Sequence, residues 1–133
     1  MSPALGDSQT VVLVEDEALV ADSLATSLEE EGYCVKILTS GRDVIVTIAE
    51  ASPAAVIMDI GLPGADGVTV AQLIRRMWPT LPIIFSTGHD DHRGLETLLG
   101  DGRTFLLKKP FAVSALTILL AQMKSSSAHM VRF

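Results

Sequence analysis

Short apolar runs recur along the chain and alternate with stretches in which apolar residues stand three or four positions apart. The runs are rich in Val, Ile and Leu and are bounded by charged residues, Gly or Pro, and they cover residues 11–14, 33–38, 55–58, 82–85 and 104–107. Runs of this length and composition are typical of β-strands. The sequence therefore predicts five strands.

The stretches between these runs have the spacing of amphipathic helices. Clear stripes are formed by Val20, Leu24 and Leu28; by Val44, Ile45, Ile48 and Ala49; by Val70, Leu73, Ile74 and Met77; and by Leu116, Leu119, Leu120 and Met123. A weaker stripe between Thr87 and Gly102 is interrupted by Gly94, and it predicts a short additional helix. Residues that favour helix ends stand at the expected places: Gly32, Ser40, Asp66 and Pro79.

Strands and helices thus alternate five times along the chain. Apolar strands separated by helices are typical of a parallel sheet that is covered on both faces, with right-handed crossovers. We therefore expect a doubly wound α/β fold with a five-stranded parallel sheet and five helices. One domain over residues 10–124 accounts for the whole pattern, and residues 1–9 and 125–133 carry little pattern and are expected to form flexible tails.

Composition narrows the class of protein. A hydrophobic fraction of 48% excludes a disordered chain, and the apolar runs are too short to cross a bilayer. The net charge of −6 argues against nucleic acid or an anionic membrane as a partner. Cys34 is the single cysteine and lies in an apolar run, so we expect a buried, unreactive side chain and a cytoplasmic protein.

Polar residues that could take part in binding or catalysis follow the predicted strands. Glu15 and Asp16 follow the first strand, Asp59 the third, Thr87 ends the fourth, and Lys109 follows the fifth. In an open α/β sheet the functional groups lie beyond the carboxyl ends of the strands. We therefore expect carboxylates, a hydroxyl and an ammonium to converge at one edge of the sheet.

Such a cluster needs positive charge. If the first and third strands are neighbours, Asp16 and Asp59 lie about 4.8 Å apart. Each like-charged pair at about 4 Å costs on the order of 4 kcal/mol at an effective dielectric constant near 20. Lys109 supplies one positive charge, and a hard divalent cation such as Mg²⁺ or Mn²⁺ would supply the remainder.

A carboxylate beside such a cation can attack phosphorus and form an acyl phosphate. Asp59 is the better nucleophile candidate, because it stands alone at a strand end before a Gly-rich loop. The alternative is that acidic residues simply end strands at a solvated edge. The Lys109-Pro110 pair argues against this alternative, because an X-Pro bond can be cis and would then aim the lysine inward.

These residues resemble those of the receiver domains of bacterial response regulators in two-component signalling. The resemblance covers roughly residues 10–123, and its motifs are VVLVEDE at 11–17, VIMDIGLPGADG at 56–67, PIIFSTGH at 82–89 and FLLKKPF at 105–111. It implies a flavodoxin-like fold with strand order 2-1-3-4-5. It also implies Asp59 as the phosphoacceptor, with a histidine kinase or a histidine phosphotransfer protein as the donor.

The resemblance implies further roles at the site. Glu15 and Asp16 would form the acidic pair, with Asp16 binding the metal directly and Glu15 acting mainly through water. The backbone carbonyl of Gly61 would be another metal ligand. Thr87 would assist at the end of the fourth strand, and Lys109 would bind the phosphoryl group.

Two residues depart from the usual family pattern. Glu15 replaces the more common Asp and lengthens the side chain without removing its charge. Many members have Tyr or Phe three positions before the lysine, whereas this chain has Leu106 there. Phe105 is one residue away, and strand side chains alternate between faces, so Phe105 should point to the opposite side of the sheet. We therefore expect the usual aromatic switch to be absent.

Three functions fit these residues. The first is a phosphorylation-driven switch that is not an enzyme in the usual sense, because it catalyses only its own phosphorylation and dephosphorylation. The second is a receiver-like interaction module that ignores phosphorylation, or the excised receiver of a hybrid histidine kinase. The third, a Mg²⁺-dependent phosphohydrolase, is disfavoured because no second acid–base residue or cap segment is available for a substrate pocket.

Overall fold

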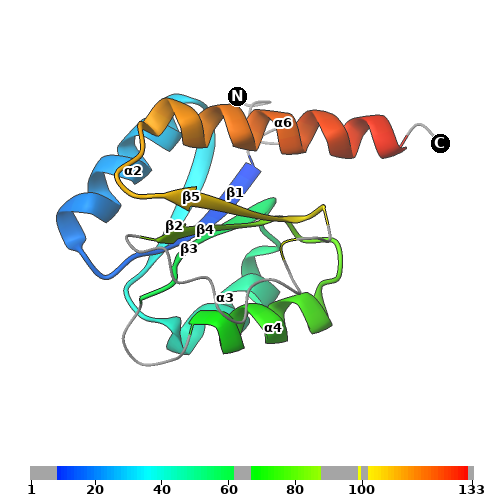
Figure 1. Cartoon of the computed structure of the whole chain (residues 1–133), viewed down its shortest axis with the longest axis horizontal. Helices are drawn as coiled ribbons and strands as arrows, with labels where there is room; N and C mark the ends of the chain where they lie inside the picture. The colour runs from blue at the N-terminus through cyan, green and yellow to red at the C-terminus, as the bar shows by residue number, and fades with distance from the viewer. Residues whose placement is uncertain (1–8, 62–66, 88–98, 100–101, 132–133) are drawn as a thin grey trace.

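Five parallel strands form one sheet in the order β2-β1-β3-β4-β5 (Figure 1). The computed structural model describes residues 9–61, 67–87, 99 and 102–131, with side chains described through Met123. The strands are β1 Gln9–Val14, β2 Tyr33–Leu38, β3 Ala55–Asp59, β4 Ile83–Thr87 and β5 Thr104–Lys108. This confirms the predicted strands and their order, and it makes β1 and β3 neighbours.

Helices cover both faces of the sheet, as a doubly wound fold requires. The helices are α2 Ala18–Glu30, α3 Val44–Ala51, α4 Gly67–Met77 and α6 Val113–Val131, with a short 3-10 turn, η1 Gly41–Asp43, before α3. In Figure 1, α2 and α6 lie above the sheet and α3 and α4 below it. The strands in the middle of the sheet therefore have to bury both of their faces.

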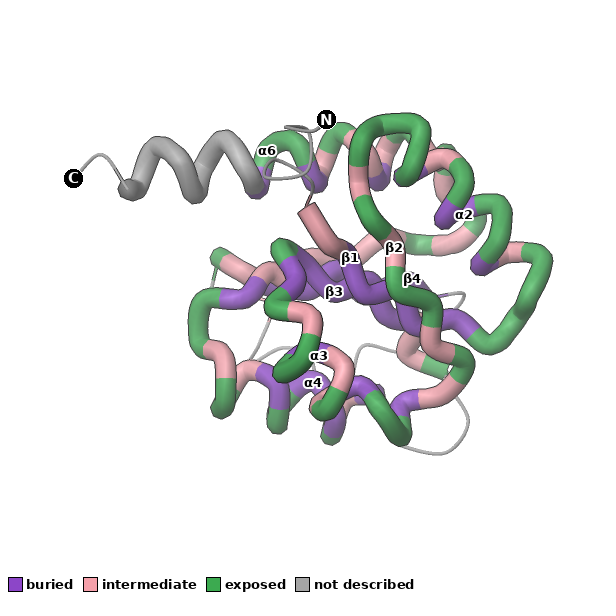
Figure 2. Tube along the Cα trace, turned by 180° about the vertical axis from the view of Figure 1, so that it is seen from behind, coloured by how far each residue is buried: buried purple, intermediate pink, exposed green. Residues whose placement is uncertain are grey.

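Alternation along the strands divides the core into two clusters. In β1, Val11 and Leu13 pack with α2 and α6, whereas Val12 and Val14 pack with α3 and α4. All four residues are at most 1% exposed. The central strands are buried along their length (Figure 2), so their apolar runs are continuous and not alternating.

The edge strand β2 differs from this pattern. Its residues are half-buried or exposed, and Cys34 is exposed. The expectation of a buried Cys34 is therefore wrong. An apolar run does not reveal whether its strand lies in the middle or at the edge of a sheet, and an edge strand has a neighbour on one side only.

The helix ends agree in part with the sequence. Gly32 has a φ of +100° just after α2, a conformation that favours glycine. The Ser40 hydroxyl accepts a hydrogen bond from the Arg42 N–H at 3.3 Å, so Ser40 caps η1 and not α3 itself. Helix α4 ends at Met77, before Pro79. The predicted cap Asp66 lies outside the described residues.

The last helix is longer than we expected. Its backbone is helical through Val131, whereas the sequence pattern suggested a tail from Ser125. The short helix expected between Thr87 and Gly102 falls almost entirely outside the described residues; Leu99 within it is helical and packs against the α3–α4 side of the core. Within the described part of the chain, no helix is both long and apolar enough to span a membrane.

Gly67, the first residue of α4, lies unusually close to the backbone of Ile60, the residue that follows Asp59. A Cβ atom at Gly67 would lie 2.8 Å from the carbonyl oxygen of Ile60 and 3.2 Å from its Cα. Both contacts are to backbone, which cannot swing aside as a flexible side chain can. The start of α4 therefore rests directly on the turn that follows β3.

We expect Gly67→Ala to lower the free energy of unfolding by about 1–3 kcal/mol, because the added methyl overpacks a backbone contact. Urea unfolding followed by circular dichroism measures this change. Gln72→Ala, at an exposed position of the same helix, is the matched control and should change stability by less than about 0.5 kcal/mol. An unchanged urea midpoint for Gly67→Ala would contradict this prediction and would show that the backbone of the turn can move to accommodate the methyl group.

Candidate phosphoacceptor and metal site

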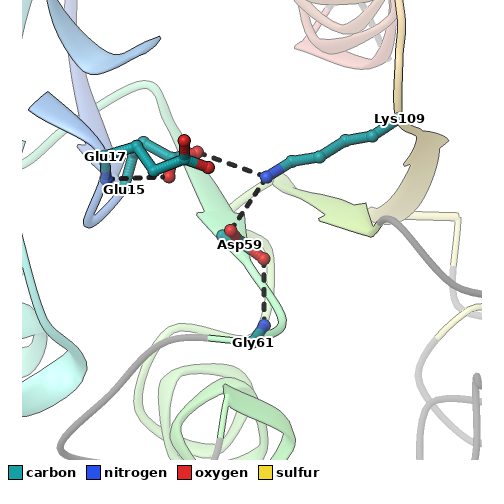
Figure 3. Close-up of polar contacts among 5 residues, drawn as sticks. All are labelled: Glu15, Glu17, Asp59, Gly61 and Lys109. Atoms are coloured by element: carbon teal, nitrogen blue, oxygen red, sulfur yellow. Dashed lines mark hydrogen bonds and ion pairs between the residues drawn. The ribbon is translucent and has the colours of Figure 1, made fainter. Parts of the chain in front are cut away.

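Side chains from three strands meet at the carboxyl edge of the sheet (Figure 3). Glu15 follows β1, Asp59 is the last residue of β3, and Lys109 follows β5. Lys109 Nζ lies 2.9 Å from Asp59 Oδ2 and 3.5 Å from Glu15 Oε1. The predicted convergence of carboxylates and ammonium is confirmed.

The backbone of Lys109 is fixed by β4. Its N–H donates a hydrogen bond to the Thr87 carbonyl at 2.7 Å, and the Lys109-Pro110 peptide bond is cis. Burial by itself would lower the pKa of the Lys109 ammonium. The hydrogen bond and charge of Asp59, with a smaller contribution from Glu15, outweigh burial, so the pKa of Lys109 is raised. The ammonium is therefore held in its charged form.

Glu15 is the buried member of the cluster, at 2% exposed. Its Oε2 accepts a hydrogen bond from the Glu17 N–H at 3.1 Å. Burial raises the pKa of the Glu15 carboxyl, and the Asp59 charge adds to this effect, while the Glu17 N–H and Lys109 act in the opposite direction; the net pKa is raised. Ionised Glu15 is thus present at an energetic cost to the folded state.

Asp59 is more accessible, since 14% of its side chain is exposed. Its Oδ1 accepts a hydrogen bond from the Gly61 N–H at 2.9 Å, and Lys109 holds the other oxygen. The next residue, Ile60, donates its N–H to the Ser86 carbonyl at 3.0 Å, which ties the turn to β4. The carboxylate is thus fixed on both oxygens while remaining open to solvent.

Glu15, Asp16 and Asp59 together form a set of hard oxygen donors. One carboxylate oxygen from each residue lies within 4.8 Å of the others. Glu15 is buried and Asp16 exposed, so one wall of the cluster is dry and the other open to water. This donor set suits Mg²⁺, which takes one or two carboxylates and keeps several waters. Metal ligation by the Gly61 carbonyl remains a prediction.

Thr87 and Leu106 lie in the fourth and fifth strands, as predicted from the sequence. Thr87 is buried at the end of β4, one residue beyond Ser86, which pairs with Asp59 in the sheet. The role of its hydroxyl stays a prediction. Leu106 packs on the α3–α4 side of the sheet and Phe105 on the α2–α6 side. The predicted opposite orientation of Phe105 is confirmed.

Three backbone groups that bind site residues were not anticipated from the sequence. They are the Glu17 N–H, which binds Glu15, the Gly61 N–H, which binds Asp59, and the Thr87 carbonyl, which binds the Lys109 N–H. Every residue except proline has both backbone groups, so no residue type indicates that they will be used. The alignment of β4 with the chain after β5 selects the Thr87 carbonyl, whereas the local backbone path after a strand selects an N–H two residues further along.

Comparison with known proteins agrees with this geometry. The model of the response regulator receiver domain matches residues 11–121. The response regulator MprA of Mycolicibacterium vanbaalenii is 34% identical over 86% of this chain and 48% of its own length. The transcriptional regulatory protein CreB of Escherichia coli is 33% identical over 78% of this chain and 45% of its own length. The chain therefore belongs to the response regulator receiver domain family, and it spans about half the length of these relatives.

Solved structures show the same fold. The signal receiver domain of a putative Luxo repressor protein from Vibrio parahaemolyticus superimposes with a TM-score of 0.81 at 26% identity, covering 93% of this chain and 96% of that chain. The receiver domain of a signal transduction histidine kinase from Syntrophus aciditrophicus gives 0.78 at 25% identity, covering 90% and 92%. Receiver domains from different kinds of signalling protein thus share this architecture.

We expect Lys109→Met to destabilise the metal-free domain by about 1–2 kcal/mol at pH 7.5, because it leaves buried Glu15 without its cation. The pKa of Glu15 is raised in the folded state, so the penalty for its charge is present at neutral pH and disappears as the carboxyl takes up a proton. The loss should therefore shrink between pH 7.5 and pH 4.5, as measured by thermal unfolding.

Lys36→Met is the matched control for this experiment. It removes the same charge from an exposed position of β2. Its effect on stability should be smaller and should vary little over the same pH range. A loss for Lys109→Met that is constant with pH would contradict the assigned ion pair with Glu15.

Proposed function

We propose that Asp59 accepts a phosphoryl group from a histidine kinase or a histidine phosphotransfer protein, and that this modification switches binding to a downstream protein. The observation that carries the proposal is the 2.9 Å contact between Lys109 Nζ and Asp59 Oδ2 within a cluster of three carboxylates. Membership of the receiver domain family supports it.

The transfer is a displacement at phosphorus. An Asp59 carboxylate oxygen forms the new P–O bond while the P–N bond to the donor imidazole breaks, and the imidazole nitrogen keeps the electron pair. The Lys109 ammonium stabilises negative charge on the phosphoryl oxygens, and the Thr87 hydroxyl donates a hydrogen bond to one of them. The product is an acyl phosphate on Asp59.

Glu15, Asp16, Asp59 and the Gly61 carbonyl would hold Mg²⁺, or Mn²⁺ in its place, with Asp16 binding directly and Glu15 through water. When bound, the ion supplies positive charge that offsets the repulsion between the carboxylates and the phosphoryl group. The donor types and their spacing fit such an ion. Lys109 contacts two of the three carboxylates, and its single positive charge cannot neutralise the cluster.

The domain would act as a signalling switch and not as an enzyme in the usual sense, because its own side chain is the group that is modified. Slow hydrolysis of the acyl phosphate would reset it. We place this activity in the cytoplasm. The net charge of −6 favours a protein partner over nucleic acid or membrane.

Incubation with acetyl phosphate and Mg²⁺ should add one phosphoryl group to the wild-type chain, as measured by intact mass. Asp59→Ala should gain none, because the nucleophile is gone, and chelation of Mg²⁺ should abolish labelling of the wild type. Asp43→Asn, which alters an exposed carboxylate that is not part of the cluster, is the control and should label normally.

Two outcomes would contradict this proposal. Labelling that persists in Asp59→Ala would assign the acceptor to another residue. A wild-type chain that binds Mg²⁺ but takes up no phosphoryl group would favour the alternative function, an interaction module that works without phosphorylation.

Mg²⁺ should stabilise the wild-type domain by about 2.7 kcal/mol at a concentration one hundred times its Kd, because it binds the folded state alone. Asp16→Asn should lose most of this stabilisation, since Asp16 is the proposed direct ligand. Thermal unfolding with and without Mg²⁺ measures both effects. Asp22→Asn, at an exposed position of α2, should respond to Mg²⁺ as the wild type does; an equal response in Asp16→Asn would exclude Asp16 as a ligand.

A further inference from the structure

Glu15 engages protein groups with both of its carboxylate oxygens. Oε2 accepts from the Glu17 N–H at 3.1 Å, and Oε1 lies 3.5 Å from Lys109 Nζ. Figure 3 shows the Glu15 side chain extending from the end of β1 toward the lysine, which reaches in from the end of β5. Both carboxylate oxygens of Glu15 are therefore held by protein groups.

We propose that Glu15 is a positioning residue for Lys109: its carboxylate is anchored by the Glu17 N–H and holds the Lys109 ammonium beside Asp59. This inference rests on the proposed function, in which Lys109 stabilises the phosphoryl oxygens. It assigns to Glu15 a role that depends on the length of the side chain as well as on its charge.

The length of the side chain decides whether the contact exists. The distance of 3.5 Å between Lys109 Nζ and Glu15 Oε1 is at the outer limit of a hydrogen bond. Aspartate has one methylene fewer, so its carboxylate would withdraw by about 1.5 Å, the length of one carbon–carbon bond. At the same backbone position, Asp would retain the negative charge but lose contact with the ammonium.

Glu15 is also placed to keep this contact during the reaction. Its side chain is 3% exposed, against 14% for Asp59, so it is shielded from water and from the phosphodonor. Phosphorylation converts the Asp59 carboxylate into a neutral acyl linkage, and Lys109 then loses one of its two carboxylate partners. Glu15 remains charged on the other side of the ammonium. It therefore keeps the ammonium beside residue 59, where it can contact the phosphoryl oxygens.

The reach and the charge of Glu15 can be separated by two substitutions. Glu15→Asp keeps the charge and shortens the side chain, whereas Glu15→Gln keeps the length and removes the charge. If Glu15 positions Lys109, the first variant should release the lysine even though the negative charge is retained. The second should weaken the response to Mg²⁺ while holding Lys109 better than the first variant does.

The test is the acylation rate of Lys109 in the metal-free chain with limiting acetic anhydride, read by mass spectrometry of proteolytic fragments. An ammonium held between two carboxylates reacts slowly. We expect Glu15→Asp to raise the Lys109 rate about three- to tenfold, a tenfold change being equivalent to about 1.4 kcal/mol. The neighbouring Lys108 is exposed and provides the reference rate in the same fragment.

Glu17→Asp is the matched control, because it shortens an exposed neighbouring carboxylate and leaves the backbone N–H of residue 17 in place. Its Lys109 rate should stay within about twofold of the wild-type rate. Equal Lys109 rates in the wild type and Glu15→Asp, with both chains folded by circular dichroism, would overturn the proposal.

This measurement needs neither metal nor phosphorylation, so its failure differs from failure of the proposed function. Phosphorylation by acetyl phosphate together with an unchanged Lys109 rate in Glu15→Asp would remove only the positioning role. In the opposite case, Lys109 is acylated faster in Glu15→Asp but the wild-type chain takes up no phosphoryl group. This result would support the positioning role and contradict the proposed phosphorylation switch. Slower phosphorylation of Glu15→Asp at saturating Mg²⁺ would support the link between them.

Discussion

The ion pairs of Lys109 allow carboxylates from two strands to occupy one edge of the sheet. Glu15 and Asp59 would repel each other across the β1–β3 pair, and the ammonium lies in contact with both. Its backbone is hydrogen-bonded to Thr87 at the end of β4. The order of the strands therefore brings a cation from the far edge of the sheet to the place where the acidic residues need it.

The three acidic residues of the cluster differ in how far they are buried. Glu15 is enclosed and its pKa is raised by burial, so it is suited to holding another group in place. Asp16 is exposed, while Asp59 is held on both oxygens and is still partly open to solvent. Three carboxylates within 4.8 Å of one another thus have three environments.

Two structural features concern how the surroundings of Asp59 are connected to the rest of the domain. Leu106 stands where many receiver domains have an aromatic residue, and Phe105 packs on the other face of the sheet. The close contact between Gly67 and Ile60 links the start of α4 to the turn after Asp59. The turn after Asp59 is therefore in direct backbone contact with the start of α4.

The sequence by itself determined the alternation of strands and helices and the residue types at the strand ends, because periodicity and strand boundaries are local properties. It also predicted the opposite faces of Leu106 and Phe105, since side chains alternate along any strand. It did not predict the exposure of Cys34, the hydrogen bond from the Glu17 N–H to Glu15, or the continuation of α6 to Val131. Exposure of Cys34 depends on which strand becomes the edge, and this is set when distant segments pack together. The Glu15–Glu17 contact depends on the backbone path between β1 and α2, which residue types do not specify.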